Sequence, residues 1–354
     1  MTENKGILIK NIYYMLTYAF QVLKQTNYEE IEAEQFEEIQ DLFAAILAKG
    51  ISQQLKQGLY REYVSRKEPL TSLRGKIDMP ETIKNKLQRR QVISCEYDEL
   101  SENNLLNQIL KTTAAILIRS NGVTSEHKKA LKKNLLFFDG IDTVEPTAIL
   151  WNRLKIQRNN KSYEMLLNIC YFVLDGLLLT TDKGVFKMAH FSDDHMARLY
   201  EKFVLEYYRH HHKEVSAGAL QVKWNLAEGS DESSIKFLPV MQTDIMLKSR
   251  TQTLIIDTKY YTRTMQSQFN SYSYHSANMY QIFTYVKNQD AAGVGNVSGM
   301  LLYAKTGEAI TPDADFMMGV NKISVKTLDL NKDFKEIAEQ LDMIVKDNFI
   351  SSVA

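Results

Sequence analysis

Neither charge predominates in this sequence, and cysteine is almost absent. Its 354 residues include 43 lysines and arginines and 43 aspartates and glutamates, so the formal net charge is zero. This excludes a protein that binds nucleic acid through its overall charge; such contacts must come from a local patch or from a partner. Cys95 and Cys170 stand alone and form no metal-binding spacing. We expect two unpaired core thiols in a reducing compartment.

Long apolar runs and nucleotide-binding loops are also missing. The segment Met1 to Gly6 lacks the apolar core of a signal peptide. The apolar stretch Ile169 to Leu179 is interrupted by Asp175 and Gly176, and no other run approaches the length that crosses a bilayer. The chain contains no Gly-x4-Gly-Lys-Ser/Thr loop. We therefore expect a cytoplasmic protein that contacts no membrane and binds no nucleotide itself.

The chain is longer than one ordinary hydrophobic core, and its character changes along its length. Residues 1–182 predict an α+β domain, in which helices are interrupted by a strand-rich section from Tyr60 to Tyr97. Turn-forming residues from Thr180 to Gly184 mark the junction. Residues 183–354 follow the order helix, three strands, helix, strand, helix, which predicts an α/β domain.

The clearest chemical pattern lies in this second half. The run Leu254-Ile255-Ile256 followed by Asp257-Thr258-Lys259 is typical of a buried strand whose end carries charge. Side chains alternate along a strand, so Asp257 and Lys259 face the same way. The segment Val240 to Leu247 also predicts a strand, and a hairpin between the two would bring Asp244 beside Asp257.

Two adjacent carboxylates need an explanation. They repel each other by about 4 kcal/mol at ~4 Å with an effective dielectric constant near 20. A hard divalent cation offsets such repulsion, and Lys259 adds a charge that orients water. The spacing Asp-x12-Asp-x-Lys therefore fits metal-assisted phosphodiester hydrolysis. The alternative is a strand-end ion pair between Asp257 and Lys259 with Asp244 in a turn, and the spacing alone leaves both open.

Neighbouring helices carry further polar candidates. Glu201 lies on the helix predicted from Asp194 to His212, within reach of the same carboxylates. Gln281 and Tyr285 are four residues apart and so share one side of the next helix. Consecutive histidines at positions 210–212 cannot share one helical face, which favours a frayed, solvated helix end over a metal site.

A concentration of positive charge lies in the strand-rich section. Four cations fall within seven residues, namely Lys84, Lys86, Arg89 and Arg90. A solvated face explains such a run, and contact with DNA or an acidic partner is the functional alternative. Because a helical domain does not need this excursion for its own core, we hypothesise that it projects as a finger with a cationic tip that contacts a partner.

The second half resembles the PD-(D/E)xK nuclease superfamily. Asp244 matches the first metal-binding carboxylate, and Asp257-Thr258-Lys259 matches the (D/E)xK element. Gln281-x3-Tyr285 is similar to the helix motif of the RecB-like branch, and Glu201 to the acidic residue of the preceding helix. The sequence departs from the pattern where Gln242-Thr243-Asp244 replaces Pro-Asp. The resemblance implies a PD-(D/E)xK domain with a central mixed sheet.

The same resemblance implies roles for these residues. Asp244, Asp257 and the Thr258 carbonyl would bind Mg²⁺ or Mn²⁺, with Glu201 as a further ligand. Asp244, Asp257 and Lys259 would be catalytic, the lysine activating or positioning the attacking water. Gln281 and Tyr285 would orient the lysine or a phosphate without binding the metal themselves.

The resemblance narrows to one family and spans nearly the whole chain. The chain resembles the McrC family, the nuclease subunits of McrBC modification-dependent restriction systems. The resemblance lies in Asn11 to Ala19, Gly75-x-Ile77, Thr243-Asp244-Ile245, Asp257-x-Lys259-Tyr260-Tyr261 and Asn278-x-Tyr280-Gln281. This implies a Mg²⁺-dependent endodeoxyribonuclease acting on double-stranded DNA that carries modified cytosine. Its partner would be an McrB-like AAA+ GTPase ring.

The family resemblance also implies a division of labour. Residues 1–182 would bind the ring and stimulate its GTPase, and residues 183–354 would form the endonuclease. Two other functions remain: a motor-independent nuclease in repair or defence, and a non-catalytic adaptor of an AAA+ ring. The long first half argues against the former, and the intact Asp244, Asp257 and Lys259 argue against the latter.

Overall fold

The chain divides into two compact units. The computed structural model describes residues 3–4, 7–20, 36–154, 161–178, 193–229, 232–260, 266–268, 271–305 and 311–350. Unit 1 contains residues 1–42 and 188–354, and unit 2 contains residues 43–187. The predicted junction at 180–184 lies outside the described residues but close to the second boundary. The first 42 residues, however, group with the C-terminal half, unlike the continuous domain expected from 1 to 182.

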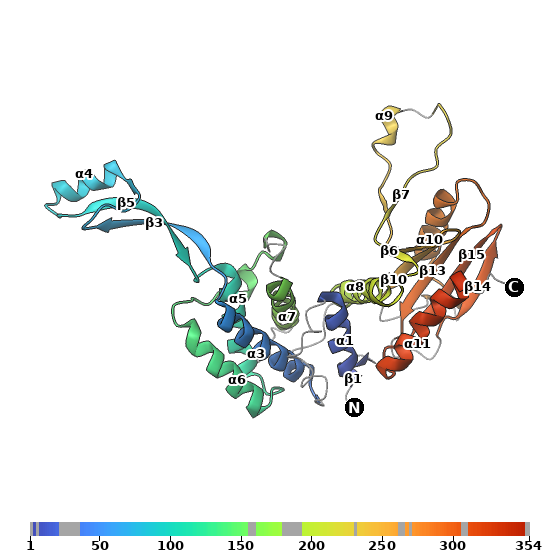
Figure 1. Ribbon diagram of the computed structural model, residues 1–354, viewed down its shortest axis with the longest axis horizontal. Coiled ribbons are helices and arrows are strands. Elements are labelled where there is room, and N and C mark those ends of the chain that lie inside the picture. The colour runs from blue at the N-terminus through green and yellow to red at the C-terminus, as the bar shows by residue number, and fades with distance from the viewer. Residues whose placement is uncertain are drawn as a thin grey trace. The chain divides into compact units, whose positions relative to one another are not determined.

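Unit 1 is built on a six-stranded mixed sheet of order β14-β15-β13-β10-β9-β6 (Figure 1). The strands are β6 (Ser216–Gly218), β9 (Ile245–Lys248), β10 (Thr253–Lys259), β13 (Val297–Ala304), β14 (Ala314–Met318) and β15 (Asn321–Leu328). Strands β10, β13 and β15 run parallel, and β6, β9 and β14 are antiparallel to their neighbours. The mixed sheet is as expected, but β14 and β15 extend it beyond the strand expected to be last.

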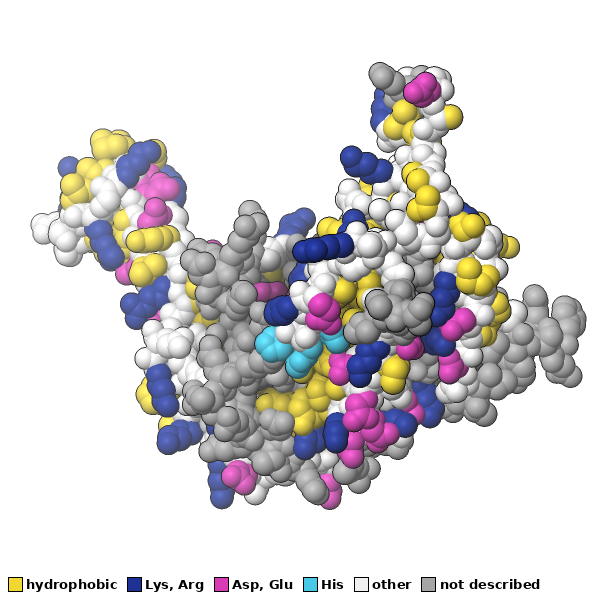
Figure 2. All heavy atoms as spheres, turned by 45° about the vertical axis from the view of Figure 1, so that its right-hand side comes forward, with side chains coloured by type: hydrophobic (Ala, Val, Ile, Leu, Met, Phe, Trp, Pro, Cys, Tyr) yellow, Lys and Arg dark blue, Asp and Glu magenta, His cyan; other side chains and the backbone are white. Residues whose placement is uncertain are grey.

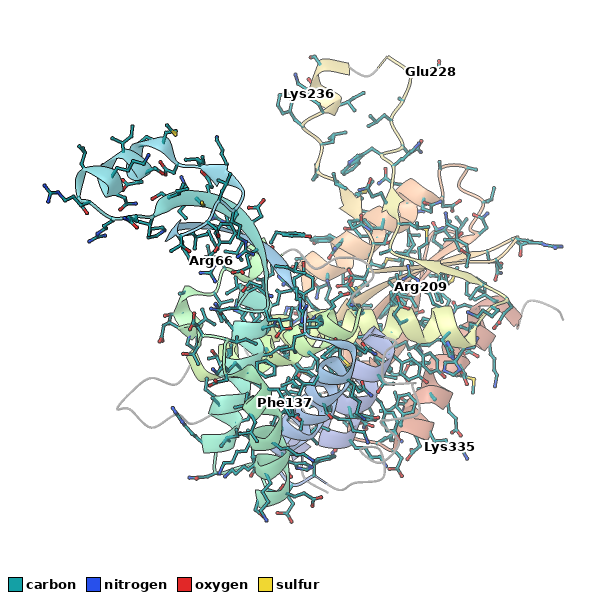
Figure 3. The ribbon with its side chains drawn as sticks, turned by 60° about the vertical axis from the view of Figure 1, so that its left-hand side comes forward. Arg66, Phe137, Arg209, Glu228, Lys236 and Lys335 are labelled. Carbon is teal, nitrogen blue, oxygen red and sulfur yellow. The ribbon has the colours of Figure 1, made fainter. Side chains whose placement is uncertain are left out.

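The first of the three expected strands lies outside this sheet. Strand β7 (Gln221–Val222) pairs with β8 (Met241–Gln242) in a separate ribbon. Between them the chain makes an excursion containing α9 (Glu232–Ile235), with Glu228 and Lys236 at its outer end (Figure 3). Shorter pairs of strands are β1 (Glu3–Asn4) with β2 (Ile7–Leu8) and β11 (Gln266–Gln268) with β12 (Ser271–Ser273).

Helices cover this sheet and bury it. They are α8 (Asp193–His211), α10 (Ser276–Gln289) and α11 (Phe334–Val345), the last followed by a π-helical turn, Lys346–Ile350. Ile282 and Val286 of α10 pack in one core cluster with Ile255 of β10 and Leu301 of β13. Strand β10 is buried from Leu254 through Asp257, as a strand covered on both faces must be.

The N-terminal helix α1 (Ile9–Phe20) packs against α8, which explains why it belongs to unit 1. Its Asn11 side chain donates hydrogen bonds of 2.7 Å to the carbonyls of Leu330 and Lys332. Its Tyr18 hydroxyl lies 2.8 Å from Nε2 of His211, at the end of α8. His210 and His211 are exposed, as expected of a solvated helix end, whereas His212 is half-buried and lies 2.8 Å from Asp342 of α11.

Unit 2 consists of a helical body and a projecting finger. The body contains α3 (Ile39–Gln57, with its first turn assigned to unit 1), α5 (Leu105–Arg119), α6 (Ser125–Leu135), α7 (Lys161–Leu178) and short 3-10 turns at Leu136–Phe138, Pro146–Ala148 and Trp151–Arg153. The finger contains β3 (Glu62–Leu70), β4 (Lys76–Ile77), α4 (Met79–Leu87) and β5 (Ile93–Ser101), in the sheet order β3-β5-β4.

Figure 1 shows this finger extending away from the helices of its own unit. The strand-rich section was expected, whereas its helix α4 was not. Cys95 and Cys170 are both buried and form no disulfide, as expected. No helix in the described part of the chain is both long and apolar enough to span a membrane.

One glycine sets how closely α10 approaches the sheet. A Cβ at Gly299 of β13 would lie 2.7 Å from Val286 and 2.8 Å from Ile282. Gly299→Ala should therefore lower the free energy of unfolding by about 1–3 kcal/mol through overpacking, measured by denaturant titration. Gly218→Ala on β6 is the matched control, because its Cβ would have only ordinary contacts, the nearest at 3.5 Å. Equal unfolding midpoints for the two variants would contradict this packing.

Candidate active site

Asp244 lies at a bend between two short strands. The strand expected from Val240 to Leu247 is interrupted at Thr243, whose hydroxyl donates a 2.7 Å hydrogen bond to the carbonyl of Leu220. Beyond the bend, β9 pairs with β10 in the register Ile245 to Ile256. The next positions in that register are Asp244 and Asp257, so the ladder ends with the two aspartates side by side.

The Asp244 carboxylate closes the end of the ladder. Its Oδ2 accepts a 2.7 Å hydrogen bond from the backbone N–H of Thr258 and a 2.9 Å bond from the Thr258 hydroxyl. Two donors on one oxygen fix the orientation of the carboxylate. The Asp-x-Lys pattern predicts a role for the Thr258 carbonyl but not for this hydroxyl, although a hydroxyl-bearing residue beside the second aspartate is visible in the sequence.

Asp257 is a buried charge beside Lys259. Its side chain is 1% exposed, and its Oδ2 lies 2.6 Å from Nζ of Lys259, which is 14% exposed. Among the described residues, however, no donor meets either Asp257 oxygen in hydrogen-bonding geometry. Burying an ionised carboxylate is costly unless it is paired and hydrogen-bonded. The carboxylate therefore has charge compensation on one side and unused acceptor capacity.

A short polar chain from α10 reaches the lysine. The Nζ of Lys259 lies 3.4 Å from Oε1 of Gln281, and Nε2 of Gln281 lies 3.1 Å from the Tyr285 hydroxyl. Tyr285 belongs to the buried core cluster. A side chain fixed in the core thus supports an amide that in turn contacts the ammonium group, which restricts where Lys259 points.

Burial and mutual repulsion shift two carboxyl groups. Burial, followed by the charge of Asp244, raises the pKa of Asp257 to about 6, although Lys259 opposes the shift. Burial raises the pKa of Glu201 to about 7, and the charges of Asp244 and Asp257 add to this, against Lys259 and Arg198. Glu201 on α8 therefore senses both aspartates electrostatically. Perturbed carboxyls of this kind are typical of functional sites.

The donors present fit a hard divalent cation. Within the described ranges, no three His, Cys, Asp or Glu side chains converge to form a metal cluster. Mg²⁺ does not need one, because it is usually held by one or two carboxylates while water and substrate phosphate complete its shell. Asp244 and Asp257 are such a pair, and Oδ1 of the buried Asp257 has no donor among the described residues. Binding a cation there would offset their repulsion.

The remaining predicted residues lie elsewhere or outside the described chain. Tyr261 of the Asp257-x-Lys259-Tyr260-Tyr261 motif is not among the described residues. Asp257 belongs to unit 1, whereas the four cations of the finger belong to unit 2: Lys84, Lys86, Arg89 and Arg90. Asn278 donates a 3.1 Å hydrogen bond to the Tyr303 hydroxyl inside unit 1, a packing role that the motif did not predict.

Comparison with known proteins gives consistent relatives. Residues 3–304 match the family described as McrBC 5-methylcytosine restriction system component. A relative from Escherichia coli (strain K12), the type IV methyl-directed restriction enzyme EcoKMcrBC, is 29% identical over 311 residues, covering 87% of this chain and 89% of the relative. A chain of a Thermococcus gammatolerans half-complex of McrB AAA+ hexamers with bound McrC has a similar fold, with a TM-score of 0.53, 19% identity, and coverage of 95% of this chain and 76% of that one.

The carboxyl pKa values lead to a pH-dependent response to Mg²⁺. At about pH 5.5 Asp257 and Glu201 hold protons, which a cation must displace; at about pH 8 both are ionised. Because both pKa values are raised in the folded state, ionisation costs the metal-free fold stability as pH rises. A cation at ~10 times its Kd should restore about 1.4 kcal/mol. We expect MgCl₂ to raise the melting temperature clearly at the higher pH and little at the lower.

The control for this prediction is Asp257→Asn, which should show no response to Mg²⁺ at either pH. Thermal melts followed by circular dichroism provide the measurement. An equal response to Mg²⁺ in the variant and the wild type would place the cation elsewhere.

Proposed function

The chain belongs to the family of McrBC 5-methylcytosine restriction system components, and from this premise we propose that it is the DNA endonuclease subunit of a GTP-dependent restriction complex directed at methylcytosine. Unit 1 would be a PD-(D/E)xK nuclease domain. The observation that carries the proposal is the meeting of Asp244 and Asp257 at the end of the β9–β10 ladder, with Lys259 at 2.6 Å from Asp257.

Each residue has a distinct role in this reading. Asp244 and Asp257, with the Thr258 carbonyl, would hold Mg²⁺ or Mn²⁺, and Glu201 would join them as it ionises near neutral pH. When bound, the cation stabilises charge on the phosphate and acidifies a bound water. Lys259 positions the attacking water or a phosphate oxygen with its ammonium protons. Gln281 and Tyr285 keep the lysine in place.

Cleavage of methylated plasmid in the presence of the motor and GTP tests these roles. Asp244→Asn, Asp257→Asn and Lys259→Gln should each lose about 10²-fold or more in rate, because each loses charge needed in the transition state. Tyr285→Phe removes only support for Gln281 and should lose about 10–100-fold.

The control in this experiment is GTPase stimulation, which all four variants should retain because they leave unit 2 unchanged. A variant that loses stimulation as well has a folding defect and is set aside. Near wild-type cleavage by Asp257→Asn or Lys259→Gln would refute the assignment.

We further propose that unit 2 binds an McrB-like AAA+ ring and stimulates its GTPase, and that the finger makes the contact. The support comes from the unusual amphipathicity of α4. Thr82 and Asn85 face inward, where the backbone N–H of Ser94 donates 3.0 Å to the Thr82 hydroxyl and Asn85 donates 2.9 Å to the Ser94 hydroxyl. The polar face of this helix is therefore buried, and its apolar face is left outward.

That outward face has the spacing of a docking surface. Met79, Ile83 and Leu87 recur every four residues and are 57%, 51% and 79% exposed, so they form one stripe along α4. Figure 2 shows apolar and positively charged side chains together on the finger. An amphipathic helix that buries its apolar face in a groove is a common recognition mode. We assign affinity mainly to this stripe, which we call the α4 stripe.

The four cations then flank the α4 stripe and steer association. Lys84 pairs with Glu81 at 2.5 Å, and Arg89 adopts a positive φ of 59° in the turn that ends the helix. Charges at the rim of an interface affect the association rate and its salt dependence more than the dissociation rate. The finger tip, which the sequence predicts to be cationic, thus also carries the exposed apolar residues of the α4 stripe.

Two finger variants separate these contributions. Replacing Met79, Ile83 and Leu87 by serine should weaken binding to the ring by more than about tenfold, or ~1.4 kcal/mol, and abolish GTPase stimulation. Reversing Lys84, Lys86, Arg89 and Arg90 to glutamate should mainly slow association at low salt. Surface plasmon resonance at two salt concentrations measures both. If both variants bind and stimulate like wild type, the finger is not the contact.

A further inference from the structure

Helix α6 in the body of unit 2 carries a regular array of lysines. Four of its eleven residues are lysines, and they occupy two consecutive turns: Lys128, Lys129, Lys132 and Lys133. Its inward face is formed by His127, Leu131 and Asn134, the last donating to the carbonyl of Ala48 on α3. Residues four apart align along a helix, so the lysines form two parallel rows on the remaining surface.

These lysines have no partner within the described residues. Their side chains make no ion pair or hydrogen bond there, unlike Lys305 and Lys326 of unit 1, which pair with Asp329 and Asp313. Three of the four are exposed, and Lys128 is half-buried. The nearest acidic residues along the chain, Glu126 and Asp139, lie beyond the two ends of the array. A chain of zero net charge thus concentrates uncompensated positive charge on one helix.

Each row ends in an exposed apolar residue. Leu136 follows Lys128 and Lys132 at the same four-residue spacing and is 77% exposed, and Phe137 follows Lys129 and Lys133 and is 64% exposed (Figure 3). The favourable placement of lysines near a helix C-terminus accounts for some of this charge. It does not account for two large apolar side chains left in water beside it.

We propose that the α6 lysines bind the phosphate backbone of double-stranded DNA, independently of base sequence. Lysine ammonium groups are point charges suited to phosphate. Asn134, which has a side chain able to read bases, is turned inward and bonded to Ala48. The inference rests on the proposed function, since DNA is the substrate there, but it concerns a binding site apart from the metal carboxylates. The α6 lysines would supply an electrostatic attraction to DNA that the zero net charge of the chain does not.

Binding of a fluorescent duplex to the full chain in EDTA tests this without cleavage. The variant replaces all four α6 lysines by glutamine, which keeps helix propensity. Each lost phosphate contact reduces the salt slope of log K by about 0.9, so four reduce it by up to about 3.6. We expect at least about a tenfold loss of affinity at low salt. Protection of these lysines from acetylation by the duplex gives a second readout on the wild type.

A matched control removes the same amount of charge elsewhere. It replaces Lys322, Lys326, Lys332 and Lys335 of unit 1 by glutamine and should bind DNA nearly as the wild type does. Equal losses in both variants would indicate bulk charge and overturn the proposal. So would unchanged DNA affinity of the α6 variant, or loss only of binding to the AAA+ ring or to anionic vesicles.

A variant that separates the apolar residues from the charge completes the test. Leu136→Ser combined with Phe137→Ser should keep the salt slope, because it removes no charge. If this variant alone loses DNA, the lysines are not the contact. Because binding is measured in EDTA, the outcome is independent of whether Asp257 acts in cleavage, and either proposal can fail alone.

Discussion

The burial of Asp257 is the constraint on which the structure of unit 1 depends. A carboxylate that is 1% exposed at the end of a central strand is tolerated only with a neighbouring charge and a rigid frame. Lys259 supplies the charge, and Asp244 accepts a hydrogen bond from the backbone N–H of Thr258. From α10, Gln281 contacts Lys259 and is itself bonded to Tyr285 in the core. The close approach at Gly299 keeps that helix near the sheet. The packing of α10 at Gly299 therefore helps to fix where the Lys259 charge lies relative to Asp257.

The two units orient their amphipathic helices in opposite ways. In unit 1, α10 buries its apolar residues against the sheet, and its polar Gln281 faces Lys259. In unit 2, α4 buries its polar residues and leaves Met79, Ile83 and Leu87 in water. The first arrangement restricts the position of Lys259, and the second leaves apolar surface exposed that the proposed contact with the ring would bury.

Local periodicity predicted the features that depend on neighbours in sequence. Strand alternation put Asp257 and Lys259 on one face, and the register of β9 with β10 brings Asp244 opposite Asp257. Long-range contacts decided what it missed. The strand breaks at Thr243 because its hydroxyl bonds Leu220, 23 residues away, and α1 joins unit 1 through Asn11 bonds spanning more than 300 residues. Helix α4 buries its polar face because Asn85 bonds Ser94, which belongs to the later strand β5.

The membership of α1 in unit 1 makes unit 2 an insertion in the covalent chain. Unit 2 is joined to unit 1 at both of its ends, near residues 42 and 187, instead of by a single linker. During synthesis α1 emerges before unit 2, yet the Leu330 and Lys332 carbonyls that bind its Asn11 are made more than 300 residues after it. Unit 2 can therefore fold while α1 still waits. Synthesis of unit 1 is completed only after all of unit 2 has been made.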